Sequence, residues 1–183
     1  LAKNAIETDS AYVVAAAGLD LLTQMDENTA LEYAQKLEDS ESSAILAAIG
    51  TLYTESGNPE YLPFFEENLD QVDGYDAISH VANYQKLAIL GDLPTIQRAV
   101  DTLEKLGGNM NQSPWRRLAA MNGLNDIRNH LRSEANALDD PDGKKKLETL
   151  VEQISQAMKA ISEKEKIDQL KEMYQQLQLI KKA

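Results

Sequence analysis

The chain has 183 residues and a mass of 20.3 kDa, which is the length of one domain with one sizeable core. Hydrophobic residues make up 43% and charged residues 26%, which excludes wholesale disorder, and the absence of Cys excludes disulfides and thiolate sites. The formal net charge is −12, and no apolar run reaches the roughly 20 residues of a membrane span. The sequence therefore predicts neither a nucleic-acid partner nor a membrane partner.

Acidic residues are concentrated in the first part of the chain. Residues 1–100 carry 17 Asp and Glu against 4 Lys and Arg, net −13, whereas residues 101–183 carry 13 against 14, net +1. Two interpretations are open: a solvated acidic face, or an acidic surface that meets a basic partner or domain. The chain opens with Leu1 and carries no leader pattern. We interpret it as a segment of a longer protein, with a proteolytic N-terminus as the alternative, and the compartment stays unassigned.

Helical periodicity begins near residue 9, and the pattern then repeats. The stretch VVAAAGLDLL at 13–22 is echoed by ILAAIGTLYT at 45–54, and their glycines are 50 − 18 = 32 residues apart. Small residues on this face allow a neighbouring helix to approach closely. A second helix follows each such helix. Three leucines in these second helices recur at spacings of 32 and 34 residues: Leu37, Leu69 and Leu103. This periodicity predicts stacked pairs of helices.

Capping residues and helix breakers give the expected boundaries. Asp26 is expected to cap the second helix and Ser40 the third. Asn58 and Pro59 are expected to open a turn before a helix that begins near Leu62, and Ser113 to open a later helix. Glycines at 57, 74, 91 and 107–108 interrupt the periodicity at the other junctions. The predicted repeat pairs span 9–38, 39–72, 73–107 and 113–161.

The last helix is expected to span 162–182. It would open at the capping box Ser162-Glu163-Lys164-Glu165. Its apolar stripe fits a terminal capping helix, with a coiled-coil seam as the alternative. No stretch alternates with period two, so no strand is predicted. The sequence thus predicts an all-α fold in which residues 1–183 form one domain, a right-handed helical-repeat α-solenoid of about nine helices.

Residue patterns that carry catalysis or bind metals are absent from the sequence. Its histidines, His80 and His130, lie 130 − 80 = 50 positions apart, and no His-Glu-x-x-His pattern occurs. Adjacent carboxylates such as Glu66 and Glu67 do not share a helix face, and no Gly-rich phosphate loop follows a strand. We predict no catalytic residue, no metal ligand and no cofactor site in this chain.

One cluster is a candidate interaction site. Trp115, the only Trp, stands beside Arg116 and Arg117 at the start of a predicted helix. Trp and Arg are favoured anchors of protein interfaces, and Arg can bind a carboxylate with two hydrogen bonds. The alternative is structural: Trp115 would fill the groove between repeats, and the arginines would pair with Asp or Glu of the preceding repeat.

Several phrases together resemble one family. In order they are SAYVVAAAGLDLL, TALEYAQKL, TESGNPEYLPFFEENL, GYDAISHVANYQKL, SPWRRLAAMNGLNDIRNHL and KIDQLKEMYQQL. They are similar to the C-terminal, HEAT-like helical-repeat region of bacterial zinc aminopeptidases of the aminopeptidase N family, over about residues 8 to 180. The family's zinc-binding and substrate motifs lie in a catalytic module N-terminal to this region and do not occur here. No catalytic or zinc-binding residue is therefore carried over.

The resemblance implies a role for the chain within a larger hydrolase. It would pack against the catalytic domain of the same polypeptide, which holds the zinc, cover the active-site cleft and restrict access to peptide substrates with free N-termini. In some relatives arginines of the helical domain face the peptide, which makes Arg116, Arg117, Arg128 and Arg132 candidates for peptide contact. The alternative function is a free-standing HEAT-like scaffold that binds another protein.

Overall fold

The computed structural model describes residues 12–179, and within this range the chain is helical, with no strand. The elements are α2 (Tyr12–Met25), α3 (Glu27–Lys36), α4 (Ser43–Ser56), the 3₁₀ helix η1 (Pro59–Tyr61), α5 (Leu62–Asn68), α6 (Gly74–Ala88), α7 (Leu93–Gly108), α8 (Pro114–Ala137), α9 (Pro141–Lys164) and α10 (Asp168–Leu179). The predicted all-α class is confirmed. The nine α-helices of the described range agree with the predicted number.

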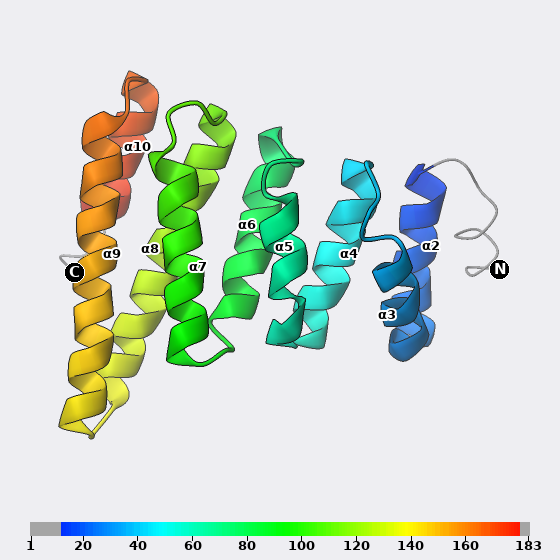
Figure 1. The fold of residues 1–183 in the computed structure, drawn as a ribbon, viewed down its shortest axis with the longest axis horizontal. Coiled ribbons are helices and arrows are strands. Elements are labelled where there is room, and N and C mark those ends of the chain that lie inside the picture. Colours follow the sequence, from blue (N-terminus) through cyan, green and yellow to red (C-terminus); the bar gives the residue numbers. More distant parts are fainter. Residues whose placement is uncertain (1–11, 180–183) are drawn as a thin grey trace.

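The helices form a two-layer array in which successive pairs lie side by side (Figure 1). The inner helices α2, α4, α6 and α8 pack on one another in chain order, and α3, α5, α7 and α9 lie across them as the outer helices. Helix α10 packs on α8 and α9 at the end of the array. The inner helices all run in the same direction, so their N-termini lie at one edge, which we call the N-edge.

Three of the predicted helix caps are confirmed. Asp26, Asn58 and Ser113 each accept a hydrogen bond from a main-chain amide two or three residues later, at 3.1, 3.1 and 3.3 Å. These bonds satisfy amides that have no partner within the helix. Helix α5 begins at Leu62 after the 3₁₀ turn, as predicted, and Gly57 ends α4 in the left-handed region with φ of 65°.

Two predicted helix starts are wrong. Ser40 does not cap α4, which begins at Ser43, because the Ser40 hydroxyl accepts instead from the amide of Ser42 at 3.2 Å within the preceding turn. Ser162 does not open the last helix, because α9 continues through it to Lys164 and α10 begins at Asp168. The carboxylate that was expected to complete a capping box belongs to Glu165, which is buried and bonded elsewhere.

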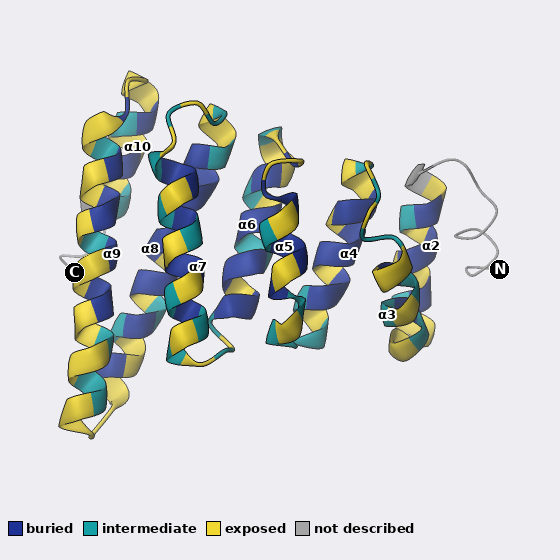
Figure 2. Cartoon of the chain, viewed as in Figure 1, coloured by how far each residue is buried: buried dark blue, intermediate teal, exposed yellow. Residues whose placement is uncertain are grey.

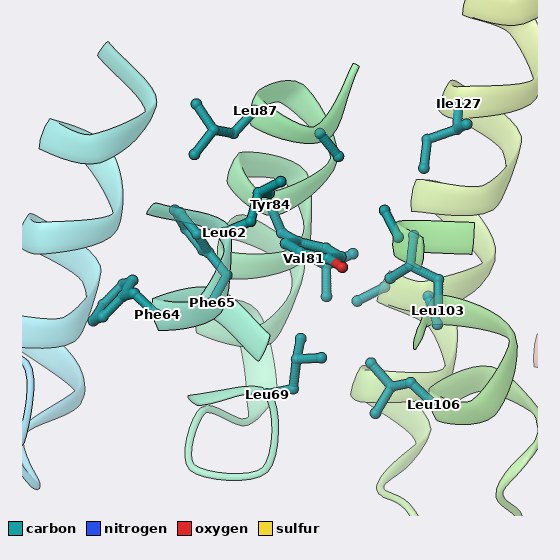
Figure 3. Close-up of a cluster of buried hydrophobic side chains, with 14 of the residues drawn as sticks. Leu62, Phe64, Phe65, Leu69, Val81, Tyr84, Leu87, Leu103, Leu106 and Ile127 are labelled. Atoms are coloured by element: carbon teal, nitrogen blue, oxygen red, sulfur yellow. The ribbon is translucent and has the colours of Figure 1, made fainter. Parts of the chain in front are cut away.

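Buried residues lie where the helices face one another, and exposed residues lie on the outer faces (Figure 2). The buried residues are mostly apolar. A cluster of aromatic rings lies within this core, around α5. Phe65 lies edge-on to Phe64 at 5.2 Å between ring centroids and meets Tyr84 at 6.3 Å (Figure 3). A Cβ at Gly50 would stand 3.2 Å from the Phe65 ring, so the glycine lets the aromatic residue approach the backbone of α4.

The repeat between the first two inner helices is shifted by one residue from the one predicted. Thr23 donates to the Leu19 carbonyl at 2.9 Å, and Thr54 donates to the Gly50 carbonyl at 2.7 Å. These equivalent bonds lie 54 − 23 = 31 residues apart. The buried residues of α2 with described side chains, Ala15, Gly18, Leu19 and Leu22, correspond at this offset to buried residues of α4. The two glycines that suggested an offset of 32 are therefore not structurally equivalent.

Candidate functional site

The predicted site residues Trp115, Arg116 and Arg117 lie together at the N-edge, on the first turn of α8. Arg116 connects this turn to the loop between α5 and α6. Its Nε donates to the carbonyl of Val72 at 2.7 Å and its Nη2 donates to the carbonyl of Asp70 at 2.6 Å. The guanidinium thus holds two main-chain carbonyls of the loop that leads into α6, whereas the structural interpretation expected it to pair with a carboxylate of the preceding repeat.

Arg117 forms a bidentate contact with a carboxylate in this region. Its Nε and Nη2 each donate to one oxygen of the Glu165 carboxylate at 2.9 Å, and both side chains are buried. Glu165 also accepts from the main-chain amides of Lys166 at 2.9 Å and Ile167 at 3.1 Å. This bidentate ion pair fastens the loop between α9 and α10 to α8, and its partner lies in a later element rather than in the preceding repeat.

The ionisation of Glu165 follows from these contacts. Burial alone would raise the pKa of its carboxyl group, but the hydrogen bonds from Arg117 and the two main-chain amides outweigh burial and hold the pKa below its ordinary value. Burial, followed by the nearby Glu165 charge, raises the pKa of the Tyr174 hydroxyl on α10. The site is therefore an ionised pair with a neutral phenol beside it.

Trp115 itself points outward. Its side chain is 47% exposed, so the interpretation in which it fills a groove between repeats is wrong. Tyr75, also exposed, occupies the same second position of α6 that Trp115 occupies in α8. The Ser113 hydroxyl donates to the Asp73 carboxylate, which joins the caps of these two helices. Because this bond joins the starts of α6 and α8, Tyr75 and Trp115 occupy matching positions on the N-edge.

The other two predicted arginines lie farther along α8. Arg128 is buried, and its Nη2 donates to the Asn125 side chain at 2.6 Å and to the Leu177 carbonyl of α10 at 3.1 Å. Burial, followed by the charge of Arg132, lowers the pKa of Arg128 to about 10. Within residues 12–179 no carboxylate forms an ion pair with it. Arg132, one turn later, is partly exposed.

The histidines are in two different environments. His80 is buried, with its Nε2 3.0 Å from the carbonyl oxygen of Phe65, and burial lowers its pKa. His130 lies on α8, 3.4 Å from the carboxylate of Glu134. Across residues 12–179, no three His, Asp or Glu side chains converge as they would around a metal ion.

A shallow groove of about 510 Å³ runs between the outer helices α7 and α9. Gly108, Ala157 and Ala160 are among its small lining residues, and Lys105 and Lys164 supply positive charge beside Asp101 and Glu104. Its mixed lining provides neither a nucleophile with a base nor a cluster of metal ligands.

The sequence indicated that Trp115, Arg116 and Arg117 are adjacent but not what they contact. The sequence analysis did not identify Glu165 as the partner of Arg117, nor Tyr75 as a second exposed aromatic residue. Tyr75 could have been found, because it lies two residues after the cap Asp73, just as Trp115 lies two residues after the cap Ser113. The suggestion that the arginines contact a peptide stays a prediction. Arg116, Arg117 and Arg128 are already hydrogen-bonded within the domain, whereas Arg132 is open to solvent in part.

No helix of the described range is long and apolar enough to cross a bilayer. No protein-family model matches the chain, and no curated protein and no solved structure shows significant similarity to it.

Proposed function

We propose that this chain is the non-catalytic C-terminal helical domain of a zinc-dependent aminopeptidase, in which it packs on the catalytic domain and shapes peptide access to the active site. In this proposal the array is a right-handed HEAT-like α-solenoid. The zinc and the hydrolytic chemistry belong to the catalytic domain of the same polypeptide. The family resemblance of the sequence phrases is what names the enzyme.

The observation that carries the packing role is the exposed aromatic pair on the N-edge, Tyr75 and Trp115. Aromatic side chains bury a large area at little entropic cost and are favoured anchors of interfaces. Their supporting loops are fixed in advance by the cap-to-cap bond and by Arg116, which reduces the ordering cost of association. The N-edge is therefore the surface that we assign to the catalytic domain.

Peptide contact in this proposal falls to Arg132, because it is partly exposed and, unlike Arg116, Arg117 and Arg128, its guanidinium forms no hydrogen bond or ion pair within residues 12–179. A guanidinium binds a peptide carboxylate with two parallel hydrogen bonds. Arg128, one turn earlier, would support it by adding positive potential.

The alternative is a scaffold that binds another protein outside any peptidase. The groove between α7 and α9 favours it, because a groove between helices can receive an extended or helical segment of a partner. The two functions differ in the size of the native polypeptide and in the surface used.

The test is to capture the native polypeptide from source cells with an antibody against this chain, and to measure its mass, its zinc content and its release of N-terminal residues from peptides. A species much larger than 20.3 kDa with chelator-sensitive activity supports the proposal. A species of 20.3 kDa without activity contradicts it and favours the scaffold.

The surface is tested with Trp115→Ala in that full-length polypeptide. We expect altered peptide turnover or a lower melting temperature. Leu138→Ala is the matched control, because Leu138 is also an exposed apolar residue but lies at the opposite end of α8. Unchanged kinetics and melting of Trp115→Ala would remove the N-edge from the proposal.

A further inference from the structure

The first helix of the described array has an apolar face that no described element covers. Val14, Ala17 and Leu21 are spaced three and four residues apart, so they form one stripe along α2. Val14 is 39% exposed and Leu21 is 44% exposed. Helix α2 is thus apolar on more than one side, which is typical of a helix that is covered on more than one side.

The equivalent stripe is covered in α4. At the offset of 31 residues, Val14, Ala17 and Leu21 correspond to Ile45, Ala48 and Leu52. Ile45 is only 3% exposed and Leu52 only 2%. Leu52 lines a small hollow together with residues of α2, so this side of α4 faces the preceding helix pair.

The same positions can be followed into α6 and α8. Three buried residues of α4 correspond to buried residues of α6 at an offset of 81 − 46 = 35 and to buried residues of α8 at a further 121 − 81 = 40. The three series are Leu46, Val81 and Met121; Gly50, Gln85 and Asn125; Tyr53, Ala88 and Arg128. The inner helices therefore share one register.

In this register the position of Ala17 faces the preceding inner helix. Its equivalent in α6 is Asn83, whose Nδ2 would lie 3.9 Å from a Cβ at Gly50 of α4. Its equivalent in α8 is Gly123, where a Cβ would lie 3.0 Å from Val81 of α6. Both contacts are made across the inner layer to the helix before.

The position of Val14 faces the preceding outer helix. Its equivalent in α6 is His80, which lies 3.0 Å from the Phe65 carbonyl of α5. Its equivalent in α8 is Ala120, which would lie 3.3 Å from a Cβ at Gly107 of α7. In α6 and α8 the stripe therefore meets both members of the preceding pair.

From this equivalence we infer that the Val14, Ala17 and Leu21 face of α2 is an interface for a further helix pair of the same kind, supplied by another part of the same polypeptide. The inner helix of that pair runs parallel to α2 and presents small and aliphatic side chains, like those that α2 presents to α4. The buried side chains of α2, which packs on α3 and α4, include Ala15, Leu19 and Leu22. The inference does not depend on the aminopeptidase proposal.

Residues 1–11 cannot supply such a helix pair. A parallel inner helix requires an outer helix to return the chain, and the shortest repeat in this array takes 31 residues. Eleven residues are too few for such a pair. A second copy of the chain is a different occupant, which the experiment separates.

The test is thiol labelling, since the chain contains no Cys of its own. Leu21→Cys reports on the stripe. Asp20→Cys is the matched control, because Asp20 and its equivalent Thr51 in α4 are both exposed, so the control position stays open even when a pair is present. Each variant is labelled with a maleimide in the native polypeptide and in the isolated 183-residue chain, and labelling is quantified at the peptide that carries the variant position.

We expect Leu21→Cys to be labelled roughly tenfold or more slowly than Asp20→Cys in the native polypeptide, and at a similar rate in the isolated chain, because a covered position reacts only through local opening. Equal rates in the native polypeptide would overturn the inference. Protection in the dilute isolated chain would assign the face to residues 1–11, and protection that grows with chain concentration would assign it to a second copy; either result also overturns it.

Discussion

Arg117 and Glu165 form a bidentate ion pair, with both N–O distances at 2.9 Å, although 165 − 117 = 48 residues separate them in the sequence. The pair is buried between α8 and the loop that leads to α10. Buried ion pairs of this kind contribute little relative to a well-packed apolar pair, but the loss of one partner leaves the other charge unpaired in the interior.

Replacing Glu165 with Ala should lower the free energy of unfolding by about 3–5 kcal/mol, because the Arg117 guanidinium would stay buried without its counter-ion. Urea unfolding followed by circular dichroism measures this loss. Glu163→Ala is the matched control: Glu163 forms an exposed pair with Lys159, and its loss should cost at most about 0.5 kcal/mol. Equal effects of the two variants would contradict the assignment.

The same pair should make stability depend on acid pH. The pKa of Glu165 in the folded protein lies below its ordinary value of 4.5, so its contribution is complete above that value and is lost as the pH falls through the folded pKa. The stability difference between the wild-type chain and Glu165→Gln should therefore shrink when urea unfolding is repeated from pH 6 down to pH 3. A difference that is independent of pH would show that Glu165 is not ionised in the folded state.

His80 should produce a second pH dependence, nearer to neutrality. Burial lowers its pKa below the ordinary 6.5, so the unfolded chain takes up a proton that the folded chain does not. The contribution of neutral His80 to the free energy of unfolding is therefore complete above pH 6.5. It falls as the pH is lowered, with a slope approaching about 1.4 kcal/mol per pH unit. Unfolding measured between pH 7.5 and 5.5 should show this slope in the wild-type chain and lose it in His80→Gln.

Replacing two glycines on neighbouring helices with Ala should change the stability of the chain in opposite directions. A Cβ at Gly123 would lie 2.9 Å from Leu103 and 3.0 Å from Val81, so Gly123→Ala should cost about 1–3 kcal/mol through overpacking. A Cβ at Gly108 meets no atom within 4 Å, so Gly108→Ala should stabilise the chain by up to about 1 kcal/mol through helix propensity. Thermal unfolding of both variants distinguishes these effects, and a Gly123→Ala variant as stable as the wild-type chain would contradict the close packing at Gly123.

The helical class and several helix starts could be predicted because they depend on local chemistry. Asp26 and Ser113 each cap a helix through the amide three residues later, and such bonds are encoded within a few positions of the sequence. The wrong start at Ser162 has a non-local cause: Glu165 was assigned to a local cap, but the folded chain uses its carboxylate for Arg117 on another helix. Sequence spacing within one segment carries no information about that partner.

The repeat was recognised with a register error for a related reason. Gly18 and Gly50 are the same residue type, but they are not equivalent positions. Position 50 requires a glycine because the Phe65 ring lies against it, whereas the equivalent position in α2 holds Leu19. The correct offset comes from Thr23 and Thr54, whose hydroxyls bond equivalent carbonyls. The exposure of the Trp115 side chain also could not be predicted from the sequence, because it depends on which elements pack against α8 in the folded chain.

The two buried arginines of α8 also have a dynamic consequence for α10. Arg117 holds the loop before this helix, and Arg128 holds the carbonyl of Leu177 near its end. Their anchoring points on α8 are 128 − 117 = 11 residues apart, or about 16 Å along the helix. A helix fastened at both ends does not fray from either one. Its amide hydrogens should therefore exchange with solvent together, in one cooperative opening that releases both guanidinium groups at once.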